Sequence, residues 1–205
     1  MNRREFVKGS LALAGAAAFF NVGCAKESAD GKETSKEGTR KMDKKCMVIY
    51  YSWSGNTRFA AETIAKRADA AIFEIKAETP YNSNFNKCCD EAKPECYGKK
   101  LRPIKAIEGL DLSKYDMIFV GSPNWWGTLA PPVRTRLTQN VAALKGKTVC
   151  LFQTHGGGGM QNLGRDFAAL LPESKVLPPK AFSGSSIKSS VQALEEFATD
   201  RIAIK

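Results

Sequence analysis

The chain has 205 residues, 43% of them hydrophobic, and a formal net charge of +10. This length is enough for one domain of ordinary size with additional segments, and it argues against two full domains. The basic residues are scattered and form no run interleaved with aromatic side chains, so the sequence predicts no nucleic-acid binding.

The first 24 residues have the layout of an export signal. Three basic residues, Arg3, Arg4 and Lys8, precede an apolar run that is shorter than the roughly 20 residues needed to span a bilayer. Residues 2–8 are similar to the twin-arginine signal, whose export route carries folded proteins. We therefore expect a periplasmic protein, or one anchored to the membrane and facing the periplasm.

Cys24 is a candidate lipidation site, because Gly23 and Cys24 are similar to the cleavage box of lipoproteins. Ordinary signal cleavage after Ala25 is one alternative, and an uncleaved terminus on a cytoplasmic protein is another. Residues 25–45 carry no aromatic or branched aliphatic side chain, so they are predicted to form a flexible linker. A lipidated Cys24 would tether the remaining domain, residues 46–205, to a membrane.

From residue 46 onward, strand and helix patterns alternate. Buried strands are predicted from apolar runs at 46–51, 71–75, 115–122 and 148–154, with a weaker one in 175–182. Apolar residues at helical spacing predict helices over 57–68, from Pro131 to Gly146, after Asn162 and over 187–202. This alternation predicts a doubly wound α/β fold with a five-stranded parallel sheet, whose ligand is expected at the carboxyl ends of the strands.

Three loops follow predicted strands at that edge. The first is Ser52-Trp53-Ser54-Gly55-Asn56-Thr57, and it opens a helix, where backbone N–H groups and hydroxyls can hold a phosphate. It has no lysine, which the loop of nucleotide hydrolases needs, so we expect a phosphate that is bound but not hydrolysed. The alternative is a polar turn in which Ser54 caps the helix.

The second and third loops have unusual compositions. The second loop is Pro123-Asn124-Trp125-Trp126-Gly127-Thr128. At least one of its two adjacent indoles should lie near the surface, where it can stack on a flat ring. The alternative is that one of the two indoles packs in the hydrophobic core. In Thr154-His155-Gly156-Gly157-Gly158-Gly159, the glycines let the backbone approach a ligand closely. His155 is the only histidine, and no metal site is predicted.

Residues 46–205 resemble the flavodoxin-like proteins that bind flavin mononucleotide (FMN). The first loop matches the family motif S/T-x-S/T-G-x-T, and the second resembles the P-x-W-W-G loop of the quinone-reductase-like branch. The resemblance implies strand order 2-1-3-4-5 and FMN as the cofactor. It places the phosphate at residues 52–57, the ring against Trp125 or Trp126, and residues 154–159 along the other ring edge. Gly158 departs from relatives, which often carry Ser there.

By this resemblance, the leading hypothesis is an exported redox protein that passes electrons to a protein partner or a quinone in the cell envelope. The alternative is a reductase that takes hydride from NAD(P)H and reduces a quinone or FMN-type acceptor, and a flavin-free binding domain is a third possibility. Export favours the carrier, because nicotinamide nucleotides are scarce outside the cytoplasm. The 21 Lys+Arg and 15 Asp+Glu of residues 46–205 leave a charge of +6, whereas carrier flavodoxins are typically acidic, so a different kind of partner is implied.

The cysteines of the domain fall into two groups. Cys88, Cys89 and Cys96 lie in the long excursion between the second and third strands, and Cys96 is predicted to bridge to Cys88 or Cys89 in an oxidising compartment; three free thiols are the alternative. Cys46 and Cys150 fall in the first and fourth strands. The resemblance separates these strands by two strand spacings, too far for a disulfide, so both are expected to be buried thiols.

Overall fold

The computed structural model describes residues 44–204. The predicted export signal, the lipidation site Cys24 and most of the predicted linker lie outside the described residues. Lys45 is already hydrogen-bonded to the domain: its N–H donates to Asp116 Oδ2 at 3.0 Å, and its carbonyl accepts from the Asp116 N–H at 2.8 Å. Within the described part of the chain, no helix has both the length and the apolarity of a membrane span.

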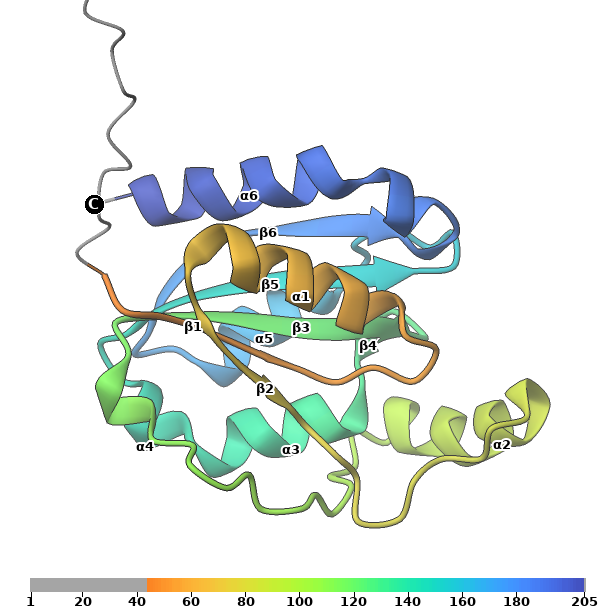
Figure 1. The fold of residues 1–205 in the computed structure, drawn as a ribbon. Helices are drawn as coiled ribbons and strands as arrows, with labels where there is room; N and C mark the ends of the chain where they lie inside the picture. Colours follow the sequence, from red (N-terminus) through yellow and green to blue (C-terminus); the bar gives the residue numbers. More distant parts are fainter. Residues whose placement is uncertain (1–43, 205) are drawn as a thin grey trace, which may run out of the picture. The chain divides into compact units, whose positions relative to one another are not determined.

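Five strands form a parallel sheet in the order β2-β1-β3-β5-β6, and a sixth, β4, pairs antiparallel with the end of β3 (Figure 1). The strands are β1 (Cys46–Tyr50), β2 (Ala71–Glu74), β3 (Met117–Trp125), β4 (Thr128–Leu129), β5 (Thr148–His155) and β6 (Lys175–Ser183). Over the parallel strands alone this is the predicted order 2-1-3-4-5, so the predicted fold class is confirmed.

Strand β4 is an antiparallel addition to the five predicted parallel strands. It forms because β3 continues beyond the predicted end at Ser122 and the chain then folds back in a hairpin, with Asn124 opposite Leu129 and Trp125 opposite Thr128. Residues expected in a loop, including Trp125, therefore sit on a strand end, whose backbone is fixed by pairing.

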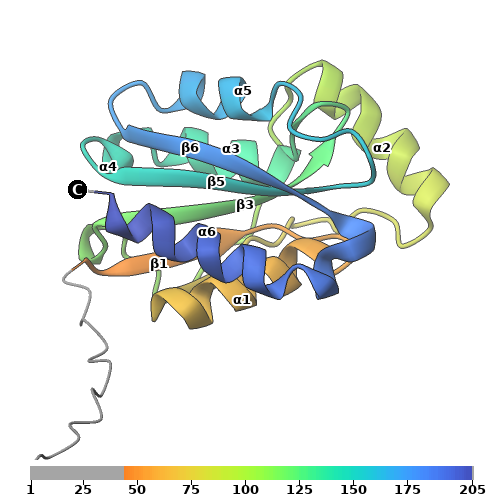
Figure 2. The ribbon, with the colours of Figure 1, turned by 90° about the horizontal axis from the view of Figure 1, so that it is seen from above.

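Helices cover both faces of the sheet. Helices α1 and α6 lie side by side on one face, whereas α3, α4 and α5 lie on the other (Figures 1 and 2). The helices are α1 (Asn56–Ala68), α2 (Phe85–Tyr97), α3 (Pro131–Gln139), α4 (Val141–Leu144), α5 (Leu163–Leu170) and α6 (Val191–Ala203), with 3₁₀ turns at Leu112–Lys114 and Gly184–Ser189. Two hydrophobic cores result, one on each side of the sheet.

The alternation of side chains along each strand builds both cores. In β1, Met47 and Ile49 belong to the core beneath α3 and α5, while Val48 belongs to the core beneath α1 and α6. Cys46 and Cys150 lie in the second of these cores as free, buried thiols, which confirms the prediction for them. Burial raises the pKa of Cys150 to about 12.

The single helix predicted from Pro131 to Gly146 is divided into α3 and α4. Asn140 separates them: its side-chain Nδ2 donates to the carbonyl of Arg136 at 2.8 Å, and its backbone has φ −123°. Such local bonding by an asparagine side chain competes with the helical pattern and explains the interruption.

The excursion between β2 and β3 contains helix α2, which was not predicted from the sequence. Cys88, Cys89 and Cys96 all lie on it as free thiols. Helical rise places Cys96 about 10 to 12 Å along the axis from the adjacent pair, well beyond the roughly 7 Å that a disulfide allows between Cα atoms. The predicted bridge from Cys96 is therefore wrong for this fold.

Candidate functional site

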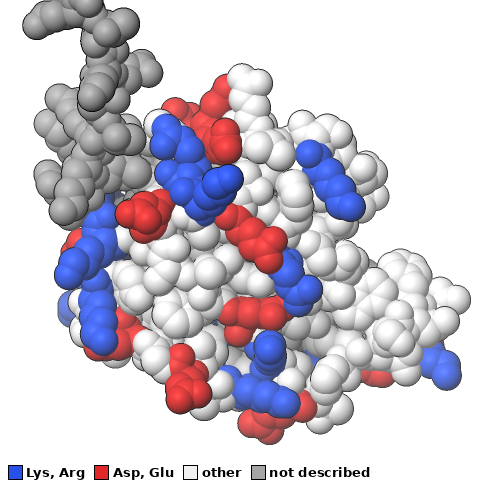
Figure 3. Space-filling view, viewed as in Figure 1, with Lys and Arg blue, Asp and Glu red and all other residues white. Residues whose placement is uncertain are grey.

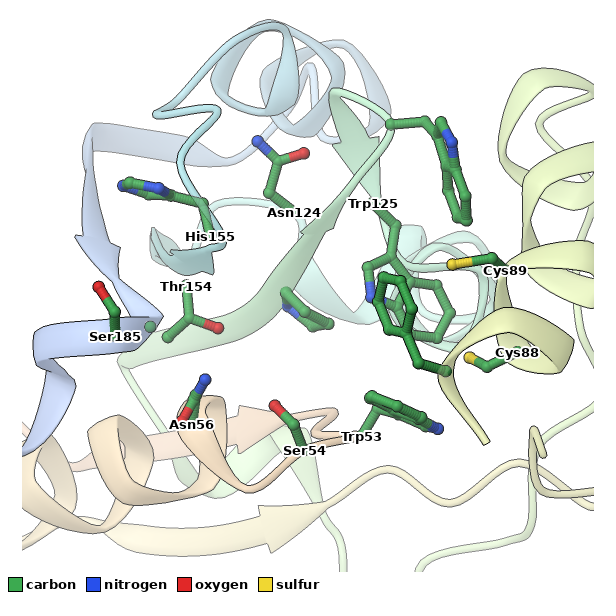
Figure 4. A pocket seen from close by; sticks show the side chains of 15 residues that line it. Trp53, Ser54, Asn56, Cys88, Cys89, Asn124, Trp125, Thr154, His155 and Ser185 are labelled. Carbon is green, nitrogen blue, oxygen red and sulfur yellow. The ribbon is translucent and has the colours of Figure 1, made fainter. Parts of the chain in front are cut away.

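A cavity of about 360 Å³ opens at the carboxyl ends of the parallel strands, the edge at which the sequence predicts a ligand (Figure 4). Its size falls in the usual range of small-molecule sites. Ten of the predicted site residues line it: Trp53, Ser54, Asn56, Pro123, Asn124, Trp125, Trp126, Thr154, His155 and Gly156. Five lining residues were not predicted: Phe85, Cys88, Cys89, Gly184 and Ser185.

The other predicted residues belong to the same three loops but are not among those that line the cavity; they are Ser52, Gly55, Thr57, Gly127, Thr128, Gly157, Gly158 and Gly159. The Ser52 hydroxyl accepts a hydrogen bond from the Gly55 N–H at 3.1 Å, which closes the first loop on itself. The Thr57 and Thr154 hydroxyls are hydrogen-bonded to each other at 2.8 Å, and both residues are buried. This bond joins the first loop to the third.

The amino end of α1 faces the cavity without a capping side chain. Gly55 is the N-cap residue, with φ +92°, and no side chain accepts a hydrogen bond from the first turn in the described structure. The alternative reading of Ser54 as a helix cap is therefore wrong. The first N–H groups of a helix have no hydrogen-bond partners within the helix, and they lie at the positive end of the helix dipole. This end of the cavity is suited to an anion such as a phosphate.

Polar side chains surround that helix end. Figure 4 shows Ser54, Asn56, Thr154 and Ser185 on one side of the cavity, with hydroxyl and amide groups available to a ligand. None of the described residues that line the cavity is Lys, Arg, Asp or Glu. An anion bound here would be held by dipoles and hydrogen bonds and not by a formal positive charge.

The opposite side of the cavity is aromatic and sulfur-rich, with Trp53, Trp125, Cys88 and Cys89 visible in Figure 4. The Trp125 ring is half-buried and meets Tyr81 edge to face at 4.9 Å between centroids. Trp126 is 36% exposed. The prediction that at least one of the two adjacent indoles lies near the surface is thus confirmed. This side is suited to a planar ring.

Trp126 and Gly127 form the two-residue turn of the β3–β4 hairpin. Both have positive φ, +48° and +78°, as a type I′ turn requires. Asn124 braces this turn: its Oδ1 accepts from the Gly127 N–H at 2.9 Å, and its Nδ2 donates to the Gly159 carbonyl at 2.8 Å. The second and third loops are therefore linked by one side chain, and Trp126 is held in a conformation that is unfavourable for a residue with a Cβ.

In the glycine loop, Gly156 borders open space. A Cβ atom built on it meets no protein atom within 4 Å, and its φ lies outside the positive range. His155 belongs to the loop structure, because its Nδ1 accepts a hydrogen bond from the Gly157 N–H at 3.0 Å. Gly156 also lines the cavity, so a ligand there can approach its backbone closely.

The unpredicted lining residues have two origins. Gly184 and Ser185 directly follow β6, so the rule that placed the other loops at strand ends would also have found them. Phe85, Cys88 and Cys89 come from α2, whose buried stripe consists of Cys88, Ala92 and Cys96. Such small side chains give a weak helical signal in sequence.

The family model for flavodoxin matches residues 45–197. The chain belongs to the flavodoxin family. A flavoprotein from Lactobacillus acidophilus NCFM, solved in complex with FMN, is 30% identical, with a TM-score of 0.60 over 71% of this chain and 97% of its own. The NMR structure of that flavoprotein's apo-form is 27% identical, with a TM-score of 0.55 over 75% and 98% of the two chains.

Oxidised Flavodoxin 1 from Bacillus cereus has the same fold at 16% identity, with a TM-score of 0.51 over 78% of this chain and 99% of its own. The flavodoxin-family fold is therefore common to this chain and to a protein of widely different sequence. The three loops at the carboxyl ends of the strands, together with α2, are the part of the fold that carries the candidate site.

Proposed function

We propose that this member of the flavodoxin family binds one FMN in the cavity and acts as an electron-transfer protein. The observation that carries the proposal is that one cavity joins the uncapped amino end of α1 to an aromatic wall containing Trp125 and Trp126. FMN has a phosphate and a planar ring at opposite ends. The FMN complex of the 30% identical flavoprotein supports the same assignment.

In this proposal, Ser54, Asn56 and the first N–H groups of α1 hold the phosphate, and the tryptophans and Phe85 hold the ring. Bound flavin supplies the chemistry of accepting and releasing one or two electrons. The protein contributes orientation, through the Asn124 and Thr57–Thr154 hydrogen bonds that fix the loops. It also contributes partial exclusion of water by the aromatic side chains.

Gly156→Val should separate folding from cofactor binding. Because a Cβ at residue 156 meets no protein atom within 4 Å, the substitution should leave the melting temperature nearly unchanged. The added side chain would occupy space proposed for FMN, so affinity should fall by about tenfold or more, equivalent to 1.4 kcal/mol. Thermal unfolding without FMN and titration with FMN give the two values. Unchanged FMN affinity would contradict this position for the cofactor.

We further propose that the domain works in the cell envelope, exported through the twin-arginine-like signal and tethered if Cys24 is lipidated. The partner is a redox protein or a quinone. On the face seen in Figure 3, basic and acidic side chains are intermingled, which favours a partner without a strong opposite charge at that face. Fractionation of cells producing the full chain tests this: recovery in the cytoplasm alone would contradict the envelope location.

Stepwise reduction distinguishes an electron carrier from an NAD(P)H-dependent reductase. No cationic side chain among the described residues lines the cavity to hold the phosphates of a dinucleotide, and three indoles line it. We expect the two electrons to enter in resolved steps, and we expect NAD(P)H oxidation with a quinone acceptor to be negligible. Turnover near the ordinary enzymatic rate of about 10 per second, without resolved steps, would overturn the carrier and favour the reductase.

A further inference from the structure

Helix α2 forms one wall of the cavity but is weakly anchored by apolar packing. It contributes Phe85, Cys88 and Cys89 to the lining, and Figures 1 and 2 show it at the end of the domain where the strand arrows point. Its large apolar side chains, Phe85 and Tyr97, are each 67% exposed. A helix that buries only small side chains gains little from hydrophobic burial, so its position must depend on other contacts.

Arg102 supplies those contacts. Its Nη1 lies 2.8 Å from Glu95 Oε1 and its Nη2 lies 3.7 Å from Glu91 Oε2, and both carboxylates belong to α2. Its Nε and Nη2 also donate to the Thr79 carbonyl, at 3.1 and 2.9 Å. The Arg102 side chain is only 11% exposed. Removing a largely buried guanidinium that makes several hydrogen bonds leaves its partners unpaired, which is costly.

The same arginine is linked through Tyr81 to Trp125, which lines the cavity beside α2. Its guanidinium stacks on Tyr81, 3.6 Å from the ring centroid, and the Tyr81 hydroxyl donates to the second carboxylate oxygen of Glu95. Tyr81 in turn packs edge to face on Trp125. The Arg102 carbonyl accepts a hydrogen bond from Thr135 of α3 at 2.8 Å, which fixes the arginine to the core.

We propose that Arg102 is a positioning residue that holds α2 against Tyr81 and Trp125, and thereby keeps the ring end of the cavity closed. The expected effect of Arg102 on FMN affinity rests on the proposed FMN function. The structural part of the proposal, the attachment of α2, does not depend on FMN. Loss of Arg102 should release α2 by local opening while the sheet and its two cores remain folded.

Thiol labelling of the reduced full chain, without FMN, tests the attachment. In the wild-type chain at pH 8, Cys89 is partly exposed and should react with iodoacetamide, whereas Cys88 and Cys96 are buried. Burial also raises the pKa of Cys88 to about 11 and of Cys96 to about 12, so the reactive thiolate is rare. Labelling at each cysteine is read by peptide mass spectrometry.

In Arg102→Met we expect Cys88 and Cys96 to be labelled about tenfold faster or more, with Cys46 and Cys150 still protected. Arg102→Lys should restore only part of the protection, because lysine lacks the planar guanidinium group, which can form hydrogen bonds and stack on a ring at the same time. Arg201→Met is the matched control and should leave Cys88 and Cys96 protected; Cys150 is not used in it, because Arg201 interacts with that thiol. Arg201 also stacks on a ring, that of Phe197 at 5.2 Å, and donates to a carbonyl, but it belongs to α6.

Two results in Arg102→Met would overturn the proposal. One is an unchanged labelling rate at Cys88 and Cys96. The other is an increase in labelling at Cys46 and Cys150 equal to that at Cys88 and Cys96, which would mean that Arg102 stabilises the whole domain. The second readout is FMN affinity, which should fall about tenfold in Arg102→Met and less in Arg102→Lys. An unchanged dissociation constant in Arg102→Met would refute the positioning role. If the wild-type chain binds no FMN, the proposed function fails, while labelling still decides how α2 is held.

Discussion

Replacing Ser54 and Thr57 together by alanine should weaken FMN binding by about 3 kcal/mol or more, over a hundredfold in the dissociation constant. Ser54 lines the polar side of the cavity, and a hydrogen bond from its hydroxyl to a phosphate is charge-assisted. Thr57 acts indirectly, because its removal leaves the buried Thr154 hydroxyl without this partner. Isothermal titration of the apoprotein with FMN measures the change.

Thr63→Ala is the matched control for this double substitution. Thr63 lies on the same helix, α1, and its hydroxyl donates to the Phe59 carbonyl at 2.9 Å, outside the set of cavity-lining residues. It should bind FMN with wild-type affinity. If the double variant also retained wild-type affinity, the Ser54 and Thr57 hydroxyls would have no part in holding the phosphate.

Trp126→Asn should make the domain more stable and the cofactor less tightly bound. Trp126 has φ +48°, a conformation that costs a residue with a Cβ about 1 kcal/mol or more, whereas Asn-Gly is the preferred pair for such a turn. The free energy of unfolding should therefore rise by about 1 kcal/mol. FMN affinity should fall about tenfold, because an aromatic surface against the ring is lost.

Urea unfolding of the apoprotein and FMN titration separate the two effects. Asp69→Asn provides the comparison: Asp69 also has a positive φ, +48°, but it is the C-cap residue of α1, at the opposite end of that helix from the cavity. This control should be stabilised without any change in FMN affinity. If Trp126→Asn lost stability and kept its affinity, Trp126 would be a packing residue and not a ring contact.

The sheet was predictable because its strands are continuous apolar runs that end in sharply polar or glycine-rich loops. Once the strands were placed, the parallel topology brought Ser54, Trp125 and Thr154 to one edge, although about 100 residues separate the first from the last. The roles of individual residues were harder to assign. Ser52 and Thr57 have the same hydroxyl chemistry as Ser54, yet their hydroxyls bond to Gly55 and Thr154, inside the fold.

Helix α2 was missed for a physical reason. Its position depends on Arg102, Glu95 and Tyr81, three polar or aromatic side chains whose contacts are formed in three dimensions and leave no apolar period in the sequence. The β3–β4 hairpin was missed because its turn contains Trp126 at a position where sequence rules expect Asn, Asp or Gly. In both cases tertiary contacts outweigh local preference at the candidate site, where such departures are expected.

Flavin binding is measured directly by incubating the purified full chain with excess FMN, removing unbound ligand, and determining flavin absorbance and extracted FMN per chain. We expect about one FMN per chain, because a single cavity has one phosphate end and one ring end. We also expect that Ser54→Ala with Thr57→Ala retains far less. A wild-type chain that remains colourless and yields no FMN would contradict the claim that this cavity is a flavin site.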